Sequence, residues 1–203
     1  ATVKSMLAVS LRLVRNVTYR FCSITDCPVV YFSEDGTKMA SSVQGDRVIN
    51  GTDTMYQPNR VDVYDVNRCT GNLSYRNYYL VPIDTVSYPN DDVKSGISFS
   101  PDGKLLYMSN MYTIYQIDIE DTNRYNALFI TGPDTSITCF PWYNNMVCGP
   151  NGKLYIGNYG GTRPYMSYID KPNIRGLGCD FVPQGVWQPY TNLMDPPNMP
   201  NYG

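Results

Sequence analysis

The sequence predicts an all-β protein of the β-propeller type. Helix signals are nearly absent, because apolar residues do not recur at helical spacing and 16 glycines and 15 prolines interrupt the long stretches. Short runs rich in β-branched and aromatic residues recur instead, at 61–64 (VDVY), 114–119 (IYQIDI) and 165–169 (YMSYI). One turn phrase also recurs between such runs. Together these features indicate repeated units of short antiparallel strands.

The recurring turn phrase appears at 32–38 (FSEDGTK), 99–107 (FSPDGKLLY) and 148–156 (CGPNGKLYI). Asp-Gly or Asn-Gly between two strand-like runs is a strong hairpin signal, because the tight turn needs positive φ at both central positions. A proline in front of the pair sets the entry into the turn in the last two copies. The expected turn-forming residues are Gly36, Gly103 and Gly152.

The spacing of these turns favours propeller blades. The first two turn glycines are 67 residues apart and the last two are 49 apart. Blades of four strands repeat at about 40 to 50 residues, so we expect a loop insertion at 44–59 to lengthen the first step. A β-sandwich is the alternative, since it also has many short strands. The propeller is favoured, because a sandwich gives no reason for the same turn phrase to recur at regular intervals along the chain.

The chain is expected to form one propeller-like domain over 1–203. About four blades fit this length, and closed four-bladed rings are rare, so the ring is expected to be partial or completed by another chain. The apolar segment 6–14 could pair with such a neighbour as an added strand. The approximate blade boundaries are 1–60, 61–95, 96–136 and 137–203.

Composition narrows the function. The 203 residues include no histidine, which excludes Ser-His-Asp and Cys-His catalysis and His-ligated metals. We therefore predict a protein that is not an enzyme and holds no cofactor or metal, although a carboxylate-based polysaccharide enzyme stays an alternative. The net charge of −2 argues against a nucleic-acid partner. No apolar run is long enough to span a membrane.

The six cysteines include no C-x-x-C pair, so a structural zinc site is poorly supported. Their even number fits disulfides in an oxidising compartment, with buried free thiols as the alternative. Proximity in sequence favours the pairs Cys22–Cys27 and Cys139–Cys148, which leaves Cys69 with Cys179. The disulfide candidates are Cys22, Cys27, Cys69, Cys139, Cys148 and Cys179.

The 19 tyrosines and two tryptophans offer the clearest functional signal. Amphipathic rings on loops suit the recognition of protein or sugar surfaces, because they bury a large area at low entropic cost. Tyrosine is also an ordinary strand residue, so each ring alone is ambiguous. The expected partner is a protein or another copy of the chain, with a glycan as a further option. The candidate binding residues are Tyr75, Tyr78, Tyr79, Tyr88, Trp142, Tyr143, Trp187 and Tyr190.

A family resemblance supports this interpretation. The segments that carry it are 64–71 (YDVNRCTG), 96–104 (GISFSPDGK), 149–156 (GPNGKLYI), 169–173 (IDKPN), 176–181 (GLGCDF) and 197–203 (PNMPNYG). They resemble secreted β-propeller-like surface proteins of Bacteroidota, a group associated with type IX secretion, gliding motility and adhesion. The likeness is good over 61–203 and loose before that.

The resemblance implies the C-terminal half of a secreted propeller, extracellular or at the cell surface. It implies a scaffold for adhesion, surface display or assembly, and no catalytic residues. Carried over residue by residue, the resemblance implies a disulfide between Cys69 and Cys179 and turns at Gly103 and Gly152. Two alternatives stay open: a subunit of an extracellular polymer or secretion-associated complex completed by a partner chain, and a propeller enzyme acting on polysaccharide.

Overall fold

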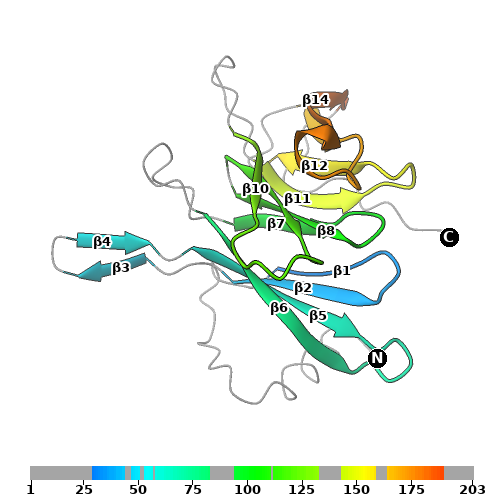
Figure 1. The fold of residues 1–203 in the computed structure, drawn as a ribbon. Helices are drawn as coiled ribbons and strands as arrows, with labels where there is room; N and C mark the ends of the chain where they lie inside the picture. The colour runs from blue at the N-terminus through cyan, green and yellow to red at the C-terminus, as the bar shows by residue number, and fades with distance from the viewer. Residues whose placement is uncertain are drawn as a thin grey trace.

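The fold is all-β and propeller-like, with three four-stranded antiparallel sheets following one another along the chain (Figure 1). Within each sheet the strands lie in the order in which the chain makes them, which is the meander of a propeller blade. The computed structural model describes residues 29–43, 47–50, 53–56, 58–82, 94–110, 112–132, 143–158 and 164–189.

The first sheet has the order β1-β2-β5-β6 and carries an inserted hairpin. The hairpin, β3 paired with β4, lies within the segment 44–59 that the turn spacing marks as an insertion, and it projects away from the three sheets (Figure 1). The strands are β1 (Val30–Phe32), β2 (Lys38–Val43), β3 (Arg47–Asn50), β4 (Asp53–Tyr56), β5 (Asn59–Val66) and β6 (Leu73–Val81).

The second and third sheets have no inserted strands. The second contains β7 (Lys94–Phe99), β8 (Leu105–Asn110), β9 (Ile114–Asp118) and β10 (Leu128–Thr131). The third contains β11 (Tyr143–Cys148), β12 (Leu154–Asn158), β13 (Tyr165–Ile169) and β14 (Phe181–Trp187), with the short 3-10 helix η1 (Gly176–Cys179) between its last two strands.

The first two predicted blades, 1–60 and 61–95, are one sheet where the structure describes them. The proposed boundary falls inside β5, because Lys38–Val43 of β2 pairs with Arg60–Asp65 of β5 in one continuous register. The spacing of 67 residues between Gly36 and Gly103 is thus long because a hairpin is inserted within the first sheet. The strand expected at 6–14 lies outside the described residues.

The repeated turn has one geometry in all three places. Gly36, Gly103 and Gly152 have φ between 66° and 74°. The preceding Asp or Asn does not have positive φ, so the expectation of two positive-φ positions is wrong. In the middle copy Gly103 N donates to Ser100 O at 2.8 Å, and Asp102 Oδ1 accepts from Ser100 Oγ at 2.7 Å. This is a type I turn, which places proline at its second position, followed by a left-handed glycine.

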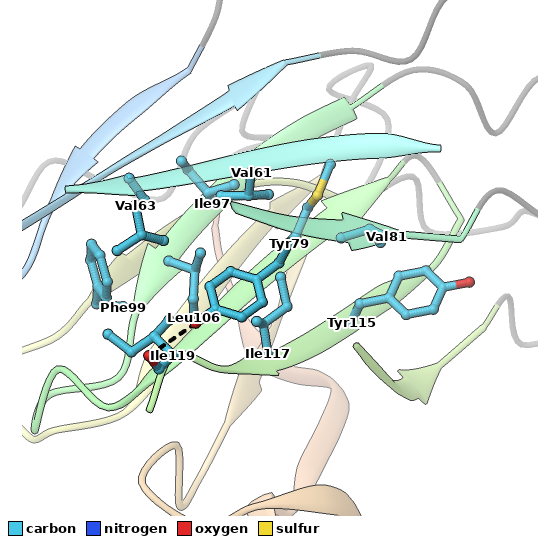
Figure 2. Close-up of a cluster of buried hydrophobic side chains, with 12 residues drawn as sticks. Val61, Val63, Tyr79, Val81, Ile97, Phe99, Leu106, Tyr115, Ile117 and Ile119 are labelled. Carbon is cyan, nitrogen blue, oxygen red and sulfur yellow. Dashed lines mark hydrogen bonds between the residues drawn. The ribbon is translucent and has the colours of Figure 1, made fainter. Parts of the chain in front are cut away.

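Two hydrophobic clusters join the three sheets. Strand alternation sends Val61 and Val63 of β5 towards the second sheet, where they meet side chains such as Leu106 and Ile117 (Figure 2). The opposite face of the second sheet, including Ile114, packs on the third sheet against residues such as Ile156. The second sheet therefore has both faces covered, whereas the first and third sheets each cover one face against it.

The first strands of the three sheets lie next to one another, with β7 between β1 and β11. The backbones of β7 and β11 approach closely at Gly96, where an added Cβ would lie 2.7 Å from Asn145 Cα and 2.9 Å from Asn144 O. Glycine is therefore required by space at this position. Among the residues that the structure describes, no helix has the length and apolar content needed to cross a membrane.

Candidate protein-binding face

The face of the first sheet turned away from the second sheet carries exposed aromatic side chains. Because Val61 and Val63 point into the shared core, Arg60, Asp62 and Tyr64 of the same strand lie on the opposite face. Residues directly paired across the strands share that face. We call it the outer face of the first sheet, and its members are Val30, Phe32, Met39, Ser41, Arg60, Asp62, Tyr64, Tyr75, Tyr78 and Leu80.

The exposed part of this outer face is apolar and aromatic. Phe32 of β1 is 52% exposed and Tyr75 of β6 is 53% exposed, while Met39 and Tyr64, which lie between them in the same row across the strands, are buried. The rings of Tyr64 and Tyr75 meet edge to face with centroids 5.5 Å apart, which fixes the orientation of the exposed ring. The two exposed rings therefore lie on the two edge strands of this face, on either side of two buried side chains.

Two arginines hold Tyr78 at the edge of this face. The guanidinium carbons of Arg60 and Arg124 lie 4.3 Å and 4.2 Å from the centre of the Tyr78 ring. Arg124 Nη1 also donates to the Tyr78 hydroxyl at 2.8 Å. Arg124 belongs to the connection between β9 and β10, and its carbonyl accepts a hydrogen bond from Leu80 N of β6 at 2.8 Å. The cation–π contacts therefore link the second sheet to the last strand of the first.

The cluster formed by Arg60, Asp62, Tyr78 and Arg124 contains two positively charged side chains and one carboxyl group. Arg60 donates to Asp62 Oδ1 through Nε at 2.8 Å and through Nη2 at 2.6 Å. Burial raises the pKa of Asp62, and the hydrogen bond from Arg60 opposes that rise. Arg124 is exposed and forms no ion pair with any acidic residue in the described ranges. Among the described residues, the cluster therefore has one positive charge without an acidic partner, on the β6 side of this face.

A β-bulge decides which tyrosines reach this face. Val63 pairs with Asn77 and Tyr64 pairs with Tyr75, so Arg76 is the extra residue of β6. The bulge reverses the side-chain alternation, which brings Tyr75 and Tyr78 to the same face although they are three residues apart. Tyr79 points into the core, where its hydroxyl lies 3.0 Å from the carbonyl oxygen of Ile119 (Figure 2). The same hydroxyl lies 3.0 Å from the carbonyl oxygen of Asp121.

Two of the predicted surface aromatics are core residues. Tyr79 and Tyr143 are each 1% exposed and pack in the clusters between the sheets, so their prediction as binding residues is wrong. Trp187 is 63% exposed at the end of β14 and is not part of the outer face of the first sheet. The remaining candidates, Tyr88, Trp142 and Tyr190, lie outside the described residues.

The third sheet has a corresponding face turned away from the second sheet, which the sequence candidates missed. Val147, Tyr155, Tyr168 and Val182 are paired side by side across its four strands and are half-buried. Lys153 Nζ lies 4.5 Å from the centre of the Tyr168 ring. Alternation along β13 could have identified this face, since Ile169 points into the core and its neighbour Tyr168 points away from it. We call it the outer face of the third sheet.

The predicted disulfides are absent where the structure describes their cysteines. Cys69, Cys148 and Cys179 are free, which contradicts the pairings Cys69–Cys179 and Cys139–Cys148. Cys69 is exposed in the connection between β5 and β6 of the first sheet, whereas Cys179 is buried in η1 of the third. Burial raises the pKa of Cys179, and burial raises the pKa of Cys148 to about 11. Cys22, Cys27 and Cys139 lie outside the described residues.

Several acidic residues in the described ranges form ion pairs. Asp65 and Glu120 both bind Arg76, at 3.1 Å and 3.0 Å. Asp118 accepts from Arg175 at 3.0 Å. Within the described residues, no group of three or more cysteine or acidic side chains is arranged to hold a metal ion. The outer face of the first sheet is therefore the candidate site on which we concentrate.

Residues 1–43 match a family described as a zinc binding domain (zf_CopZ). This match covers 43 of the 203 residues. The matched range contains two cysteines and no histidine, whereas a closed structural zinc site needs four cysteine or histidine ligands. The donor set of this range does not fit such a site. No curated protein matches the sequence.

Several solved structures resemble parts of the chain. A candidate 6-phosphogluconolactonase of Bacteroides fragilis is 22% identical over 77% of this chain and 38% of its own, with a TM-score of 0.46. The β-propeller domain of Cps50 (Swd1) from Myceliophteria thermophila is 11% identical over 64% of this chain and 36% of its own, with a TM-score of 0.39. A second candidate 6-phosphogluconolactonase, from Bacteroides uniformis, is 11% identical over 69% and 52%, with a TM-score of 0.36. The chain therefore spans about half or less of each of these proteins.

Proposed function

We propose that the chain is a non-enzymatic β-propeller scaffold that works by binding protein, in an extracellular or cell-surface setting. The observation that carries this proposal is the outer face of the first sheet. There, exposed Tyr75 lies on the same strand as Tyr78, whose ring contacts Arg60 and Arg124, and exposed Phe32 lies on the opposite edge strand of the same face. Tyrosine and arginine are among the residue types enriched at the energetic centres of protein interfaces, and phenylalanine is enriched at interfaces in general.

The arrangement favours a protein partner because it is preorganised. Binding normally costs free energy to immobilise long side chains at the interface. Here Tyr64 already orients Tyr75, and Arg124 is already stacked and hydrogen-bonded on Tyr78. A partner that brings an apolar surface and one carboxylate would bury the rings and neutralise Arg124. Self-assembly is one form that this scaffold function can take.

The non-enzymatic part of the proposal is supported by the absence of histidine from the chain and by the roles of the acidic residues. The absent histidine removes the commonest general base at neutral pH. The described carboxylates at Asp62, Asp118 and Asp170 are bonded to arginine or lysine, and Asp35 and Asp102 stabilise turns. The extracellular setting is supported by the resemblance of 61–203 to secreted surface proteins. Protease treatment of intact cells that releases peptides of this chain would support that setting.

Binding to purified extracellular proteins tests the proposed function. The immobilised chain is offered a panel of such proteins and a parallel panel of polysaccharides, and the double variant Phe32→Ser/Tyr75→Ser is compared with the wild type. We expect protein binding to fall at least about tenfold in the double variant, because hot-spot residues cost more than 1 kcal/mol each. Leu177→Ser is the matched control, since Leu177 is 77% exposed but lies on η1.

Three outcomes would contradict the proposal. One is binding to polysaccharides alone, and another is binding that the double variant leaves unchanged. The third is hydrolysis of a polysaccharide or a sugar lactone by the purified chain. An unchanged thermal melt of the double variant shows that a loss of binding does not come from unfolding.

A further inference from the structure

The third copy of the repeated turn has asparagine where the other two copies have aspartate. Residue 151 is Asn, whereas residues 35 and 102 are Asp, and a glycine follows in all three. An asparagine before glycine readily loses its side-chain amide, because glycine has no side chain that obstructs attack by its backbone nitrogen. We propose that Asn151 is a site of deamidation, which the folded turn slows through the Tyr155 hydroxyl and whose aspartate product the turn accommodates.

The reaction joins two groups that are adjacent in the chain. The backbone nitrogen of Gly152, once it has lost its proton to hydroxide, attacks Cγ of Asn151. The bond between Cγ and Nδ2 breaks, ammonia leaves, and a cyclic succinimide remains. Water then opens the ring. Cleavage between the Gly152 nitrogen and Cγ gives aspartate, and cleavage between that nitrogen and the main-chain carbonyl carbon gives isoaspartate. Asparagine and water thus become aspartate or isoaspartate and ammonia, without oxidation or reduction.

Asn151 is exposed on the turn between β11 and β12, so hydroxide and water reach it. Three hydrogen bonds of the folded turn oppose the attack. Gly152 N donates to Gly149 O at 2.9 Å, which holds the proton that must leave. Asn151 Oδ1 accepts from Lys153 N at 3.3 Å, and Asn151 Nδ2 donates to the Tyr155 hydroxyl at 2.9 Å. The side-chain amide is therefore held at its oxygen and at its nitrogen while the turn is closed.

The Tyr155 hydroxyl takes the place that a serine hydroxyl has in the other two copies. Ser33 and Ser100 each donate from Oγ to the aspartate two residues later, at 2.6 Å and 2.7 Å. The corresponding residue of the third copy is Gly149. An added Cβ at Gly149 would lie 2.6 Å from Cε2 of Tyr155, so the tyrosine ring packs directly on this glycine. The missing serine side chain thus leaves room for the ring whose hydroxyl reaches Asn151.

Aspartate at position 151 would fit this turn. In the first two copies the aspartate accepts from the backbone nitrogen two residues later, and Asn151 accepts from Lys153 N in the same way. A carboxylate has a second oxygen that can accept from the Tyr155 hydroxyl, so this bond would persist with its direction reversed. Isoaspartate instead adds a carbon atom to the backbone, which displaces Gly152 from its partner. The turn should therefore accept aspartate and be disturbed by isoaspartate.

Peptide mapping by mass spectrometry tests the proposal on the full chain. The protein is incubated at mildly alkaline pH, folded in buffer or unfolded in guanidinium chloride. Mapping follows Asn151 separately from the other Asn-Gly pair at 50–51. We expect the deamidation of Asn151 to be slower in buffer than in guanidinium chloride. Asn72 is the internal reference, since it is exposed but followed by leucine, and it should react more slowly than Asn151 in guanidinium chloride. Equal rates of Asn151 in the two solutions, or no reaction of Asn151 in guanidinium chloride, would overturn the proposal.

The variant Tyr155→Phe removes the hydroxyl and keeps the ring. We expect its Asn151 to deamidate about twofold to tenfold faster in buffer than that of the wild type, which corresponds to the loss of one hydrogen bond. Tyr168→Phe is the matched control, because the Tyr168 ring lies beside that of Tyr155, with centroids 6.0 Å apart, and its rate should stay that of the wild type. In guanidinium chloride all three proteins should react at one rate. Equal rates of Tyr155→Phe and the wild type in buffer would overturn the role of Tyr155.

Urea unfolding separates the turn from the rest of the fold. A faster reaction of Tyr155→Phe with an unchanged urea midpoint supports the proposal, and one that a lower midpoint fully explains would overturn it. Asn151→Asp carries the expected product, so we expect its midpoint to equal that of the wild type. A clearly lower midpoint of Asn151→Asp would show that the turn does not accommodate aspartate. None of these outcomes bears on the proposed function, because residue 151 is not part of the outer face of the first sheet.

Discussion

Tyr107 of β8 donates its hydroxyl proton to the carbonyl oxygen of Pro172 at 2.8 Å, which joins the second sheet to the connection between β13 and β14. The same hydroxyl accepts from Gln116 Nε2 at 2.6 Å. Gln116 in turn accepts from Gly176 N at 2.7 Å. A small buried network thus holds the third sheet on the second, next to the hydrophobic cluster between them.

Replacing Tyr107 by phenylalanine tests this network. We expect Tyr107→Phe to lower the free energy of unfolding by about 1–3 kcal/mol, because the buried carbonyl of Pro172 loses its donor and Gln116 loses an acceptor. Urea unfolding of the two proteins gives the difference. Tyr125→Phe is the control, since Tyr125 is 75% exposed and should change the stability little. Equal stability of Tyr107→Phe and the wild type would contradict this prediction, because it would show that the hydrogen bonds of the Tyr107 hydroxyl add nothing to the stability that packing of the ring supplies.

The close approach of β7 and β11 makes a second prediction. An alanine at Gly96 would place its Cβ 2.7 Å from Asn145 Cα and 2.9 Å from Asn144 O, and backbone atoms cannot move aside as a flexible side chain can. We expect Gly96→Ala to destabilise the fold by about 1–3 kcal/mol, as overpacking of a core does. The midpoint and slope of urea denaturation measure this change.

Gly176→Ala separates crowding from backbone conformation. Gly176 has φ of +72° and nothing within 4 Å of an added Cβ, so its substitution costs about 1 kcal/mol for the left-handed conformation alone. Gly96→Ala should therefore be the more damaging of the two. The reverse order would contradict the close approach of the two strands.

Thiol reactivity gives a third prediction. We expect an alkylating reagent at about pH 8 to modify Cys69 first, because Cys69 is exposed. Cys148 should react slowly, since burial raises its pKa to about 11 and leaves little thiolate. Cys179 is fully buried and should react only after unfolding. Mass spectrometry of the peptides follows the three sites separately, and a bridge between Cys69 and Cys179 would contradict the structure.

The repeated turn phrase and the β-rich runs predict much of the fold. Runs 61–64, 114–119 and 165–169 correspond to β5, β9 and β13, which are the third strands of the three sheets. Local chemistry suffices here, because Asp-Gly and Asn-Gly set the turns and alternation sets the buried face. The division into four blades is less predictable, because the inserted hairpin β3–β4 lengthens one sheet without adding another.

The candidate site is harder to predict, because it depends on register and on contacts between sheets. The bulge at Arg76 reverses the alternation of β6, so sequence parity cannot tell that Tyr75 is exposed and Tyr79 is buried. Arg124 reaches Tyr78 across 46 residues, through a contact that only the packing of two sheets creates. Proximity in sequence likewise fails for Cys139 and Cys148, since Cys148 is free. The remaining pair, Cys69 and Cys179, fails because the two residues belong to connections of different sheets.

The first Asp-Gly turn predicts a dependence of stability on pH. Asp35 accepts hydrogen bonds from Ser33 Oγ at 2.6 Å, from Thr37 N at 3.0 Å and from Thr37 Oγ1 at 2.7 Å. These bonds lower the pKa of Asp35 to about 2, and the bond from Ser33 has the largest effect. A carboxyl whose pKa is lowered by folding stabilises the folded state above its unfolded pKa. That stabilisation is lost as the pH falls from about 4 to about 2.

Urea unfolding of the wild type and Asp35→Asn at a series of acidic pH values measures this contribution. We expect Asp35→Asn to be less stable than the wild type at neutral pH by less than about 1 kcal/mol, because the carboxylate is exposed and screened by solvent. The difference should shrink below about pH 4 and vanish only below about pH 2, where the wild-type carboxyl becomes protonated as well. A difference that stays constant across this range would show that the turn depends on the shape of the side chain at position 35 and gains nothing from its charge.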